Sequence, residues 1–283
     1  MTMTLPPVTY PPLRGAPVRD VLLDRVRLAL ADGAPRKLII VQVGHDDAST
    51  VYVTAKRKAA LGVGLPCEIV TLDTPDEDEA VARVAALGEM PDVTAMIVQL
   101  PLPAGWDVQQ VLDAIPPAKD ADGLTTAQKA LQAAGDPAAI WPATPLGVMR
   151  LLDFYGIDVT GKRAVVIGQS DLVGKPLAAL LKTAGAEVVT FGKSEPDPMN
   201  KARAADILCV ATGAVHLITP EWVKPGAVVV DVGITRRARA DGTTEIVGDV
   251  RPDVAAIAGG LTPVPGGVGP TTVGCLLANA VGI

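Results

Sequence analysis

The sequence predicts an α/β protein of two domains, each with a mainly parallel sheet covered by helices. Three observations carry this prediction. Apolar runs of strand length alternate with segments of helical period over most of the chain. The alternation pauses near residues 142–160 and then begins again. In the second series a glycine-containing turn joins a strand directly to a helix, so we expect the C-terminal domain to be a Rossmann-like dinucleotide-binding domain.

The first series of elements follows from periodicity and from the residues that end each run. In chain order we expect a helix over 18–30, a strand over 38–43, a helix over 49–61, a strand over 67–72, a helix over 76–87 and a strand over 93–100. Gly44 ends the first strand, and Pro101 and Pro103 end the third because proline cannot donate to a strand ladder. Strands that alternate with helices predict a parallel sheet with both faces covered.

The second series begins after a helix expected over 145–155. Strands are expected over 163–168, 187–191, 206–210 and 227–232, with helices over about 175–183 and 252–258 and a terminal helix over 271–281. We therefore predict an N-terminal domain over 1–145, on which a terminal helix in 270–283 packs back, and a dinucleotide-binding domain over 146–269.

Composition excludes several classes of protein. Of 283 residues, 49% are hydrophobic and 20% charged, which is incompatible with a disordered chain. The net charge of −6 and the lack of a basic block argue against nucleic-acid binding. The longest apolar run, Ile207–Val215, is shorter than the roughly 18 residues of a membrane helix. With no evident secretory signal, three widely spaced cysteines and two histidines, we expect a cytoplasmic protein without disulfides or a metal site.

The turn Gly168–Gly174 is the candidate cofactor site. Backbone N–H groups and a helix N-terminus at such a turn bind pyrophosphate, although an ordinary strand–helix turn is the alternative. Gly168, Gln169 and Ser170 do not complete the usual glycine pattern. The next strand ends at Lys193 without the carboxylate that selects NAD, so a lysine there favours the 2′-phosphate of NADP, with NAD as the possible second cofactor.

Tyr52 and Lys56 are the first candidate catalytic residues. They stand four residues apart on a predicted helix and therefore share a face. An ammonium group favours the phenolate of a neighbouring tyrosine, and lysine serves in acid–base catalysis. The alternative is a solvated charge run, Lys56-Arg57-Lys58. Short-chain dehydrogenases also use a Tyr-x-x-x-Lys pair, but there the glycine-rich loop comes before the pair rather than after it.

Three further places are candidates. Gln99 lies near the end of a predicted strand, where ligands of open α/β sheets gather; a bond to a neighbouring loop is the alternative. Asp120 and Asp122 lack the register of a calcium loop, which leaves an Asx-stabilised turn or one exposed carboxylate that binds substrate. The proline- and glycine-rich segment 263–272 could bring backbone amides to a ligand or could be a tight crossover.

Together these segments resemble the bifunctional methylenetetrahydrofolate dehydrogenase/cyclohydrolase family. The resemblance covers about residues 38–280, in family order and spacing. Its motifs here are VYVTAKRKAALGVG, IVQLPLP, KDADGL, PATPLGVMRLL, AVVIGQSDLVGKPLAALL, VVVDVGI and TPVPGGVGPTTVGCLLANA. It implies a cytoplasmic homodimer of two-domain subunits, with the active cleft between the domains.

The resemblance also implies roles for individual residues. Asp122 would bind the pterin, Lys56 would perform the acid–base work, Gln99 would hold Lys56, and Tyr52 would stack on or orient the folate. The remaining implied positions divide into a folate slot and a cofactor site. Those of the folate slot are Val98, Leu100, Pro265, Gly266, Gly267 and Thr271, and those of the cofactor site are Gly168, Gln169, Ser170 and Ile234. Lys193 joins the cofactor site from its place at the strand end rather than from the resemblance.

The implied reactions are oxidation of 5,10-methylenetetrahydrofolate by NADP⁺ and hydrolysis of the methenyl product to 10-formyltetrahydrofolate. Two departures concern the cofactor: many family members have arginine where Gln169 stands, and a His-Ser pattern is missing around Phe191-Gly192-Lys193. A shikimate-dehydrogenase-like oxidoreductase is one alternative, but it does not explain PGGVGP. A catalytically silent folate- or nucleotide-binding protein is the other.

Overall fold

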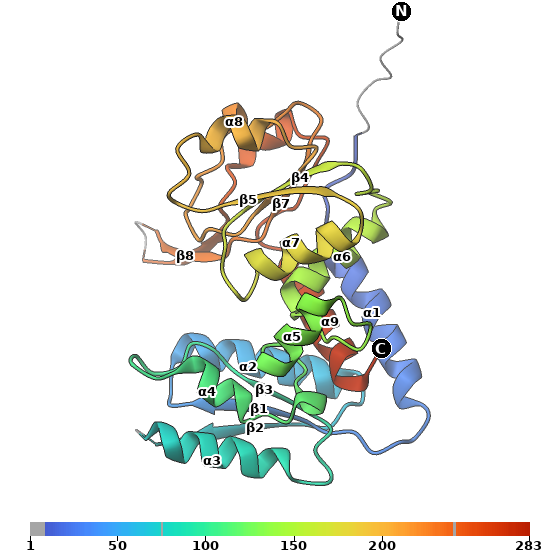
Figure 1. Ribbon diagram of the computed structural model, residues 1–283, viewed down its shortest axis with the longest axis vertical. Helices are drawn as coiled ribbons and strands as arrows, with labels where there is room; N and C mark the ends of the chain where they lie inside the picture. Colours follow the sequence, from blue (N-terminus) through green and yellow to red (C-terminus); the bar gives the residue numbers. More distant parts are fainter. Residues whose placement is uncertain (1–8, 75, 240–241) are drawn as a thin grey trace, which may run out of the picture. The chain divides into compact units, whose positions relative to one another are not determined.

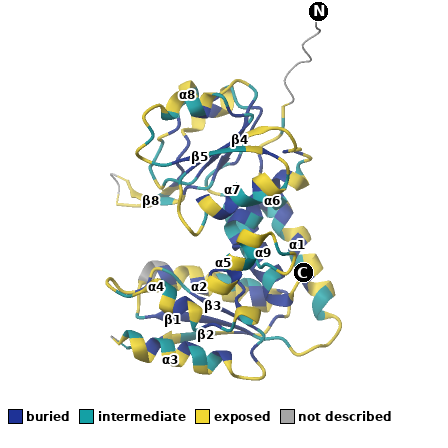
Figure 2. Cartoon of the chain, in the orientation of Figure 1, coloured by how far each residue is buried: buried dark blue, intermediate teal, exposed yellow. Residues whose placement is uncertain are grey.

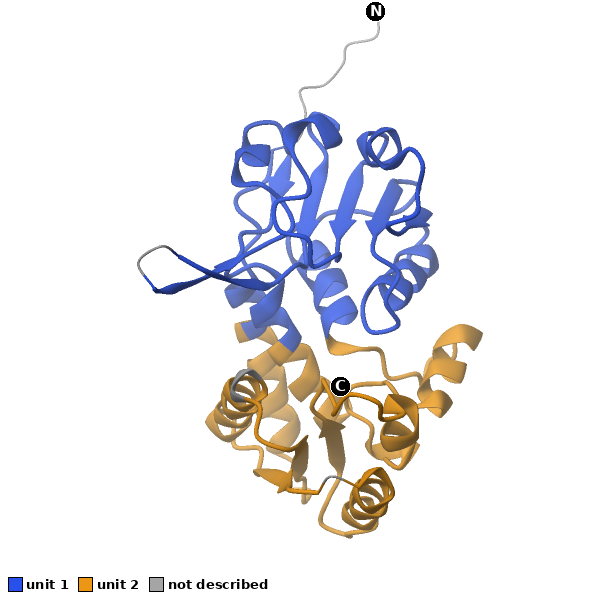
Figure 3. Ribbon diagram, turned by 90° about the vertical axis from the view of Figure 1, so that its left-hand side faces the viewer, with its two compact units in different colours: residues 1–19, 144–272 blue, residues 20–143, 273–283 orange. Residues whose placement is uncertain are grey.

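The computed structural model describes residues 9–74, 76–239 and 242–283 (Figure 1). The chain divides into two compact units (Figure 3). Unit 1 holds Thr144–Thr272 and the N-terminal residues through Arg19, and unit 2 holds Asp20–Ala143 and Val273–Ile283. The predicted α/β class with parallel sheets is confirmed in both units.

Unit 2 is built on a three-stranded parallel sheet. Its strands are β1 (Leu38–Val43), β2 (Cys67–Leu72) and β3 (Ala95–Val98), in the order β2-β1-β3. The first two have the predicted bounds. The third is shorter than predicted because its ladder to β1 runs only from Leu38↔Ala95 to Val41↔Val98. All six residues of β1 are buried, as expected for a central strand covered on both faces (Figure 2).

Helices cover both faces of this sheet. α2 (Asp47–Gly62) lies on one face and α3 (Glu77–Gly88) on the other (Figure 1). Each begins at an aspartate whose carboxylate accepts backbone N–H bonds: Asp46 from Ser49, and Asp76 from Asp78 and Glu79. The apolar faces of α3 and of a short helix later in the chain, α4 (Val108–Asp113), pack on the sheet and form one hydrophobic core with it. That core contains Ile39, Val41, Val43, Leu72, Ala80, Val84, Val93, Met96, Val98, Leu102, Val111, Leu112, Ile115 and Leu124.

Two short helices of unit 2 were not predicted. They are α4 (Val108–Asp113) and α5 (Thr126–Ala134), which lie after β3 on either side of a 3₁₀ turn, Pro117–Lys119. Their signals were caps rather than periodicity. Asp107 accepts from the N–H groups of Gln109 and Gln110, and Gly135 ends α5 in the left-handed region with φ 66°.

Unit 1 carries a five-stranded parallel sheet in the order β10-β7-β6-β4-β5. The first four strands along the chain lie within one residue of prediction at each end: β4 (Arg163–Ile167), β5 (Glu187–Phe191), β6 (Ile207–Val210) and β7 (Val228–Asp231). The fifth, β10 (Gly260–Leu261), pairs with β7 and was not predicted. α7 (Gly174–Thr183) lies on one face of the sheet and α8 (Pro198–Arg203) on the other (Figure 1).

Three regions of unit 1 differ from expectation. The segment expected as a helix over 252–258 is a 3₁₀ helix, Pro252–Ala256, because β10 follows too closely for another turn. An unpredicted antiparallel hairpin, β8 (Thr235–Ala238) and β9 (Thr244–Val247), extends from the sheet after β7. The N-terminal residues through Arg19 group with unit 1 rather than with the predicted N-terminal domain, since Tyr10 and Leu13 donate N–H bonds to Gly259 and Leu261.

The points at which the chain passes from one unit to the other fall within three helices. α1 (Gly15–Leu30) and α9 (Val268–Val281) begin in unit 1, and α6 (Ala143–Phe154) begins at the last residue of the long segment of unit 2. Asn279 of α9 donates to the carbonyls of Ala121 and Trp141 at 2.9 and 3.0 Å, so the terminal helix packs on the N-terminal domain as predicted. Among the described residues no helix is long and apolar enough to cross a membrane.

Candidate active site

Lys56 and Gln99 form the centre of the candidate site in unit 2. The ammonium Nζ of Lys56, on α2, donates to Oε1 of Gln99 at 3.1 Å. Lys56 is half-buried, whereas the following cations Arg57 and Lys58 are exposed. The reading as a solvated charge run therefore fits Arg57 and Lys58 but not Lys56. Tyr52, one turn earlier on α2, keeps 43% of its surface exposed.

The end of β3 fixes the orientation of Gln99. Its backbone N–H donates to the carbonyl of Val41 at 2.8 Å, which continues the ladder one residue beyond the strand. Its side-chain Nε2 donates to the carbonyl of Leu100 at 2.6 Å. Because the amide nitrogen is engaged there, the amide oxygen is the atom that faces Lys56. Leu100 is half-buried and Val98 is buried within β3.

The two aspartates of the KDADGL segment have different surroundings. Asp120 is buried, and its carboxylate accepts from the N–H groups of Asp122, Gly123 and Thr125 at 3.2, 2.8 and 2.8 Å. This is the Asx-stabilised turn that the sequence allowed. The same turn presents Asp122, whose half-buried carboxylate accepts no hydrogen bond from any residue that the structure describes.

Asp122 and Lys56 are electrostatically coupled. Burial raises the pKa of Asp122 above its ordinary value, and the positive charge of Lys56 opposes that rise. Burial also raises the pKa of Asp120, while its backbone hydrogen bonds oppose the rise and the nearby Asp122 adds to it. The Lys56 ammonium thus lies near the amide oxygen of Gln99 and near the carboxylate of Asp122, which accepts no hydrogen bond from the described residues. This arrangement is suited to proton transfer and to binding the N–H groups on one edge of a polar ring.

The predicted ligand positions after Val264 lie in the other unit. Pro265 is exposed, Gly266 half-buried and Gly267 buried. The carbonyl of Gly266 accepts from the N–H of Gly15 at 2.9 Å. Thr271 is completely buried, and its hydroxyl donates to the carbonyl of Val268 at 2.7 Å. Gly266 and Thr271 therefore have structural contacts of their own in unit 1.

A second candidate site lies at the carboxyl ends of β4, β5 and β6 in unit 1. A cavity of about 600 Å³ is lined there by the loops that follow these strands. The sheet order reverses at β4, whose neighbours are β6 and β5, and ligands of open α/β sheets bind at such a point. Its lining includes Gly168, Gln169, Ser170, Gly192, Lys193, Ala211, Thr212, Ala214 and Trp222.

The backbone at Gly168 fits a bound dinucleotide. Its φ of 115° lies in a region that glycine adopts readily and that residues with a side chain rarely adopt. A Cβ at this position would overlap the carbonyl oxygen of Ala211. Ser170 Oγ accepts from the N–H groups of Val173 and Gly174 at 3.2 and 3.4 Å, which shapes the start of α7. The predicted cofactor residues Gly168, Gln169, Ser170 and Lys193 therefore border one cavity, with Gly168 giving close backbone approach.

The cations near this cavity are not equivalent. Lys193 is exposed and forms no ion pair with any described residue, while Lys175 is paired with Asp171 at 2.6 Å. Gln169 Nε2 donates to Thr190 Oγ1 at 3.4 Å. Ile234, the fifth predicted cofactor residue, follows β7, is 48% exposed, and is not among the residues that line this cavity.

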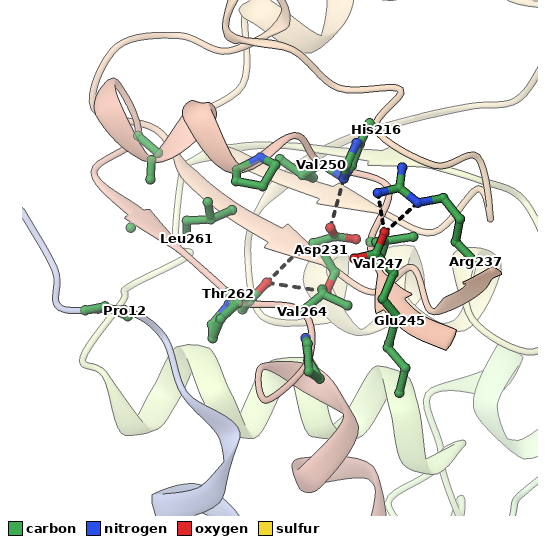
Figure 4. Close-up of a pocket in the computed structure, with 18 of the residues that line it drawn as sticks. Pro12, His216, Asp231, Arg237, Glu245, Val247, Val250, Leu261, Thr262 and Val264 are labelled. Atoms are coloured by element: carbon green, nitrogen blue, oxygen red, sulfur yellow. Dashed lines mark hydrogen bonds and ion pairs between the residues drawn. The ribbon is translucent and has the colours of Figure 1, made fainter. Parts of the chain in front are cut away.

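The sequence analysis missed a larger cavity of about 940 Å³ in unit 1 (Figure 4). It lies against the β8–β9 hairpin, β10 and the segment before α1, with His216, Asp231 and the Arg237–Glu245 ion pair on its wall. Its elements are distant in sequence, and the hairpin itself was not predicted. The sequence signals that could have indicated this cavity are two residue triplets, Asp231-Val232-Gly233 and Gly248-Asp249-Val250. Each triplet contains an aspartate, a valine and a glycine.

Comparison with known proteins covers nearly the whole chain. Residues 13–122 match the family described as tetrahydrofolate dehydrogenase/cyclohydrolase, catalytic domain, and residues 142–283 match its NAD(P)-binding domain. The bifunctional protein FolD of Acidiphilium cryptum is 46% identical over 246 residues, 86% of each chain. FolD of Thermus thermophilus is 43% identical over 91% of this chain and 89% of its own.

Solved structures agree with these sequence matches. The FolD methylenetetrahydrofolate dehydrogenase/cyclohydrolase of Campylobacter jejuni superposes with a TM-score of 0.91 at 36% identity, over 96% of this chain and 97% of that one. The Trypanosoma brucei enzyme, solved with NADP and an inhibitor, gives a TM-score of 0.87 at 35% identity, over 98% and 97% of the two chains.

Proposed function

Because the chain belongs to the tetrahydrofolate dehydrogenase/cyclohydrolase family, we propose that Lys56, Gln99, Asp122 and Tyr52 carry the chemistry of its two activities. The enzyme oxidises 5,10-methylenetetrahydrofolate to the 5,10-methenyl form with NADP⁺ and hydrolyses that product to 10-formyltetrahydrofolate. In this proposal unit 2 supplies the catalytic residues and unit 1 the cofactor pocket, close to the predicted divisions at 145/146 and 269/270.

Asp122 binds the substrate in this proposal. Its half-buried carboxylate lacks hydrogen-bond donors among the described residues, and a pterin ring offers an amino group and a ring N–H on one edge. A carboxylate that accepts both would make a charge-assisted pair of bonds. Asp120 has the separate task of shaping the turn, because its oxygens already accept three backbone N–H bonds.

Lys56 transfers protons during the hydrolysis. Water adds to the cationic methenyl carbon and loses both its protons as the formyl C=O forms. The bond from that carbon to N5 breaks, N5 takes up one proton, and the other is released to solvent. A lysine whose ammonium is held at 3.1 Å from Gln99 Oε1, and which is near the charge of Asp122, is suited to move these protons. Tyr52, one helical turn away, orients the folate. The Lys56–Gln99 contact is the observation that carries this assignment.

The cofactor pocket meets the requirements of NADP⁺. When bound, this cofactor supplies the acceptor for the hydride that leaves the methylene carbon. Gly168 and Ser170 would hold the pyrophosphate through backbone contact, Lys193 and Gln169 would face the ribose phosphate, and Ile234 would add an apolar contact. In the folate slot, the other assigned positions are Val98, Leu100, Pro265, Gly266, Gly267 and Thr271. NAD⁺ remains the second cofactor to test.

The deciding experiment measures absorbance with 5,10-methylenetetrahydrofolate and each nicotinamide cofactor. We expect reduced cofactor to form with NADP⁺, and separately supplied methenyltetrahydrofolate to disappear faster than its uncatalysed rate. Absence of both reactions, in protein that still binds folate or nucleotide, would instead indicate a catalytically silent binding protein.

We infer a homodimer in the cytoplasm as the working form. The family resemblance supports the dimer. Three buried cysteines, none of them in a disulfide among the described residues, support a reducing compartment. Light scattering during size-exclusion chromatography should give twice the mass of the 29.0 kDa chain. A single-chain mass at micromolar concentration would overturn the dimer without affecting the assigned reactions.

A further inference from the structure

Two buried carboxylates in unit 1 have no role in the chemistry proposed above. Asp231 ends β7 and is 3% exposed, and Asp249 follows β9 and is completely buried. Burying a carboxylate costs free energy unless hydrogen bonds compensate for the lost water. The donors that surround each carboxylate therefore indicate what it holds in place.

Asp231 holds the segment that carries Asp249. Its Oδ1 accepts from the N–H groups of Gly233 and Asp249 at 2.9 and 3.1 Å. Its Oδ2 accepts from the N–H of Val250 at 2.9 Å (Figure 4). Thr262 Oγ1 in turn accepts from the Asp231 N–H at 2.7 Å. Asp231 thus ties the strands β7 and β10 to the residues that follow β9.

The carboxylate of Asp249 accepts all its hydrogen bonds from one turn. Its Oδ2 accepts from Thr212 N at 2.6 Å, from Thr212 Oγ1 at 2.9 Å and from Gly213 N at 3.0 Å. Its Oδ1 has no hydrogen-bond partner among the described residues. All the donors to this carboxylate belong to the Thr212–Gly213 turn, so this turn is what the buried carboxylate holds in place.

Two glycines make room for the pair. A Cβ at Gly233 would overlap Oδ1 of Asp249, and a Cβ at Gly248 would overlap Oδ2 of Asp231. Each carboxylate therefore packs against the glycine in the other's triplet. The triplets Asp231-Val232-Gly233 and Gly248-Asp249-Val250, one before and one after the β8–β9 hairpin, interlock.

The turn held by Asp249 forms one side of the cofactor pocket. Thr212 and its neighbours Ala211 and Ala214 line the cavity of about 600 Å³ together with Gly168. The carbonyl of Ala211 is also the atom that a side chain at Gly168 would overlap. Movement of this turn would therefore change the space available at the pyrophosphate turn.

We propose that Asp249 is a positioning residue for the cofactor, which holds the Thr212–Gly213 turn in its binding shape and is itself fixed by Asp231. The inference rests on the proposed function, in which this pocket binds NADP⁺. A turn held rigid before binding loses less conformational entropy when the cofactor arrives, which strengthens binding. Hydrolysis of the methenyl compound needs no nicotinamide cofactor and therefore does not require this turn.

The test is calorimetric titration of NADP⁺ into the intact enzyme and its variants, with cyclohydrolase turnover of supplied methenyltetrahydrofolate as a second readout. Asp249→Ala removes the acceptor of all three bonds and should raise the Kd of NADP⁺ by about tenfold, about 1.4 kcal/mol. Asp249→Asn retains an acceptor oxygen and should raise it less. Cyclohydrolase turnover should stay within about twofold of wild type in both, since a fold that is intact keeps unit 2 working.

Two further comparisons keep the test decisive if Asp249→Ala does not fold. Thr212→Val removes one donor without changing side-chain shape, and should raise the Kd by about threefold, while Thr212→Ser keeps the hydroxyl and should not. Asp206→Ala is the matched control. Asp206 comes directly before the first residue of β6, pairs with Lys224 at 2.7 Å, and is not among the residues that line the cavity. It should leave the Kd unchanged.

The outcomes separate this inference from the function on which it rests. Wild-type enzyme that fails to bind NADP⁺ contradicts the proposed function. If wild-type enzyme binds NADP⁺ and Asp249→Ala has the same Kd, the positioning role is overturned. Where Asp249→Ala does not fold, an unchanged Kd in Thr212→Val overturns it instead. A parallel loss of NADP⁺ binding and cyclohydrolase turnover in both variants overturns it too, because that result describes a general structural residue.

Discussion

The surroundings of its ammonium group set Lys56 apart from the two cations that follow it. Arg57 and Lys58 are exposed on α2, whereas Lys56 is half-buried and contacts Gln99. Helical geometry explains the difference, since residues four apart share a face and adjacent residues do not. The sequence spacing predicted the Tyr52/Lys56 face and the resemblance implied Gln99 as the partner of Lys56; the end of β3 brings the two side chains to 3.1 Å.

Replacing Lys56 tests its role in proton transfer. Lys56→Met keeps the length and apolar stem of the side chain but removes the titrating group. We expect cyclohydrolase turnover to fall by about 10²-fold or more, while folate affinity changes little. Lys58→Met, on the same helix but exposed, is the control and should remain active. Wild-type turnover in Lys56→Met would remove this lysine from the mechanism.

Asp122 is expected to act through binding. Asp122→Ala removes the acceptor for the pterin donors and should weaken folate affinity by about 1.5–3 kcal/mol, measured by calorimetry. Asp122→Asn keeps one acceptor oxygen and should lose less. Circular dichroism should be unchanged in both, because the turn is held by Asp120 instead. Folate affinity equal to wild type in the folded Ala variant would exclude Asp122 from the site.

Cofactor preference depends on few charges at the pocket. Lys193 is the cation without an ion pair among the described residues that line the cavity, and Gln169 adds no charge. An exposed cation contributes about 0.2–1 kcal/mol, so we expect a modest preference for NADP⁺ over NAD⁺ in kcat/KM. Gln169→Arg should improve NADP⁺ and leave NAD⁺ nearly unchanged, because only NADP⁺ carries the additional phosphate.

Two lysine variants check this account of the cofactor preference. Lys193→Ala should lower kcat/KM for NADP⁺ and not for NAD⁺. Lys175→Ala should have little effect, because the Lys175 ammonium is already paired with Asp171 at 2.6 Å. A wild-type preference for NAD⁺, or an equal effect of Lys193→Ala on both cofactors, would contradict the account.

At the scale of elements, the turn between β4 and α7 depends on Gly168. Its φ of 115° and its closeness to the carbonyl of Ala211 leave no room for a side chain. Gly168→Ala should therefore lower the free energy of unfolding by more than about 2 kcal/mol and weaken NADP⁺ binding. Chemical denaturation and cofactor titration measure the two effects.

Gly161→Ala is the matched control for Gly168→Ala. Gly161 also has a positive φ, 66°, but nothing lies within 4 Å of a Cβ placed there. It should cost only the backbone strain, about 1 kcal/mol, and leave the Kd of NADP⁺ unchanged. Equal losses in the two variants would show that the contact with Ala211 does not matter.

Short elements show where periodicity fails. α4, α5 and α8 contain too few turns for an apolar repeat to be recognised, and β10 has only two residues. The strands β1, β2 and β5 were predicted with their observed bounds because each is a run of apolar or β-branched residues ended by glycine, proline or polar residues. Elements whose boundaries depend on distant partners, such as β3, are less well predicted.

For the whole molecule, the buried carboxyl group of Asp231 links stability to pH. Burial raises the pKa of Asp231 from 3.8 to about 6; backbone hydrogen bonds oppose this rise and the nearby Asp249 adds to it. The unfolded chain releases this proton near its ordinary pKa, so between about pH 4 and 6 the folded state binds more protons. Through this group, stability is therefore lost as the pH rises across that window.

Comparison with Asp231→Asn isolates the effect. From about pH 4.5 to 7, the unfolding free energy of wild type should fall by about 2 kcal/mol relative to the variant, measured by denaturation at each pH. Asp206→Asn is the control: pairing with Lys224 lowers the pKa of Asp206, so its pH dependence lies below this window. A constant difference between wild type and Asp231→Asn would show that the carboxyl does not titrate there.

The sequence by itself determined the α/β class, most strands and the strand–helix turn at Gly168, while the four residues proposed for catalysis came from the family resemblance and stay a prediction. The class, the strands and the turn follow from local causes: side-chain periodicity, glycine and proline at element ends, and motif spacing. Tertiary structure decided that Asp120 shapes the turn of KDADGL and that the carboxylate of Asp122 accepts no hydrogen bond from the described residues. It also grouped the N-terminal residues through Arg19 with unit 1. It alone joined Asp231 and Asp249 to the Thr212 turn, because hydrogen bonds between segments far apart in sequence leave no periodic signal within either segment.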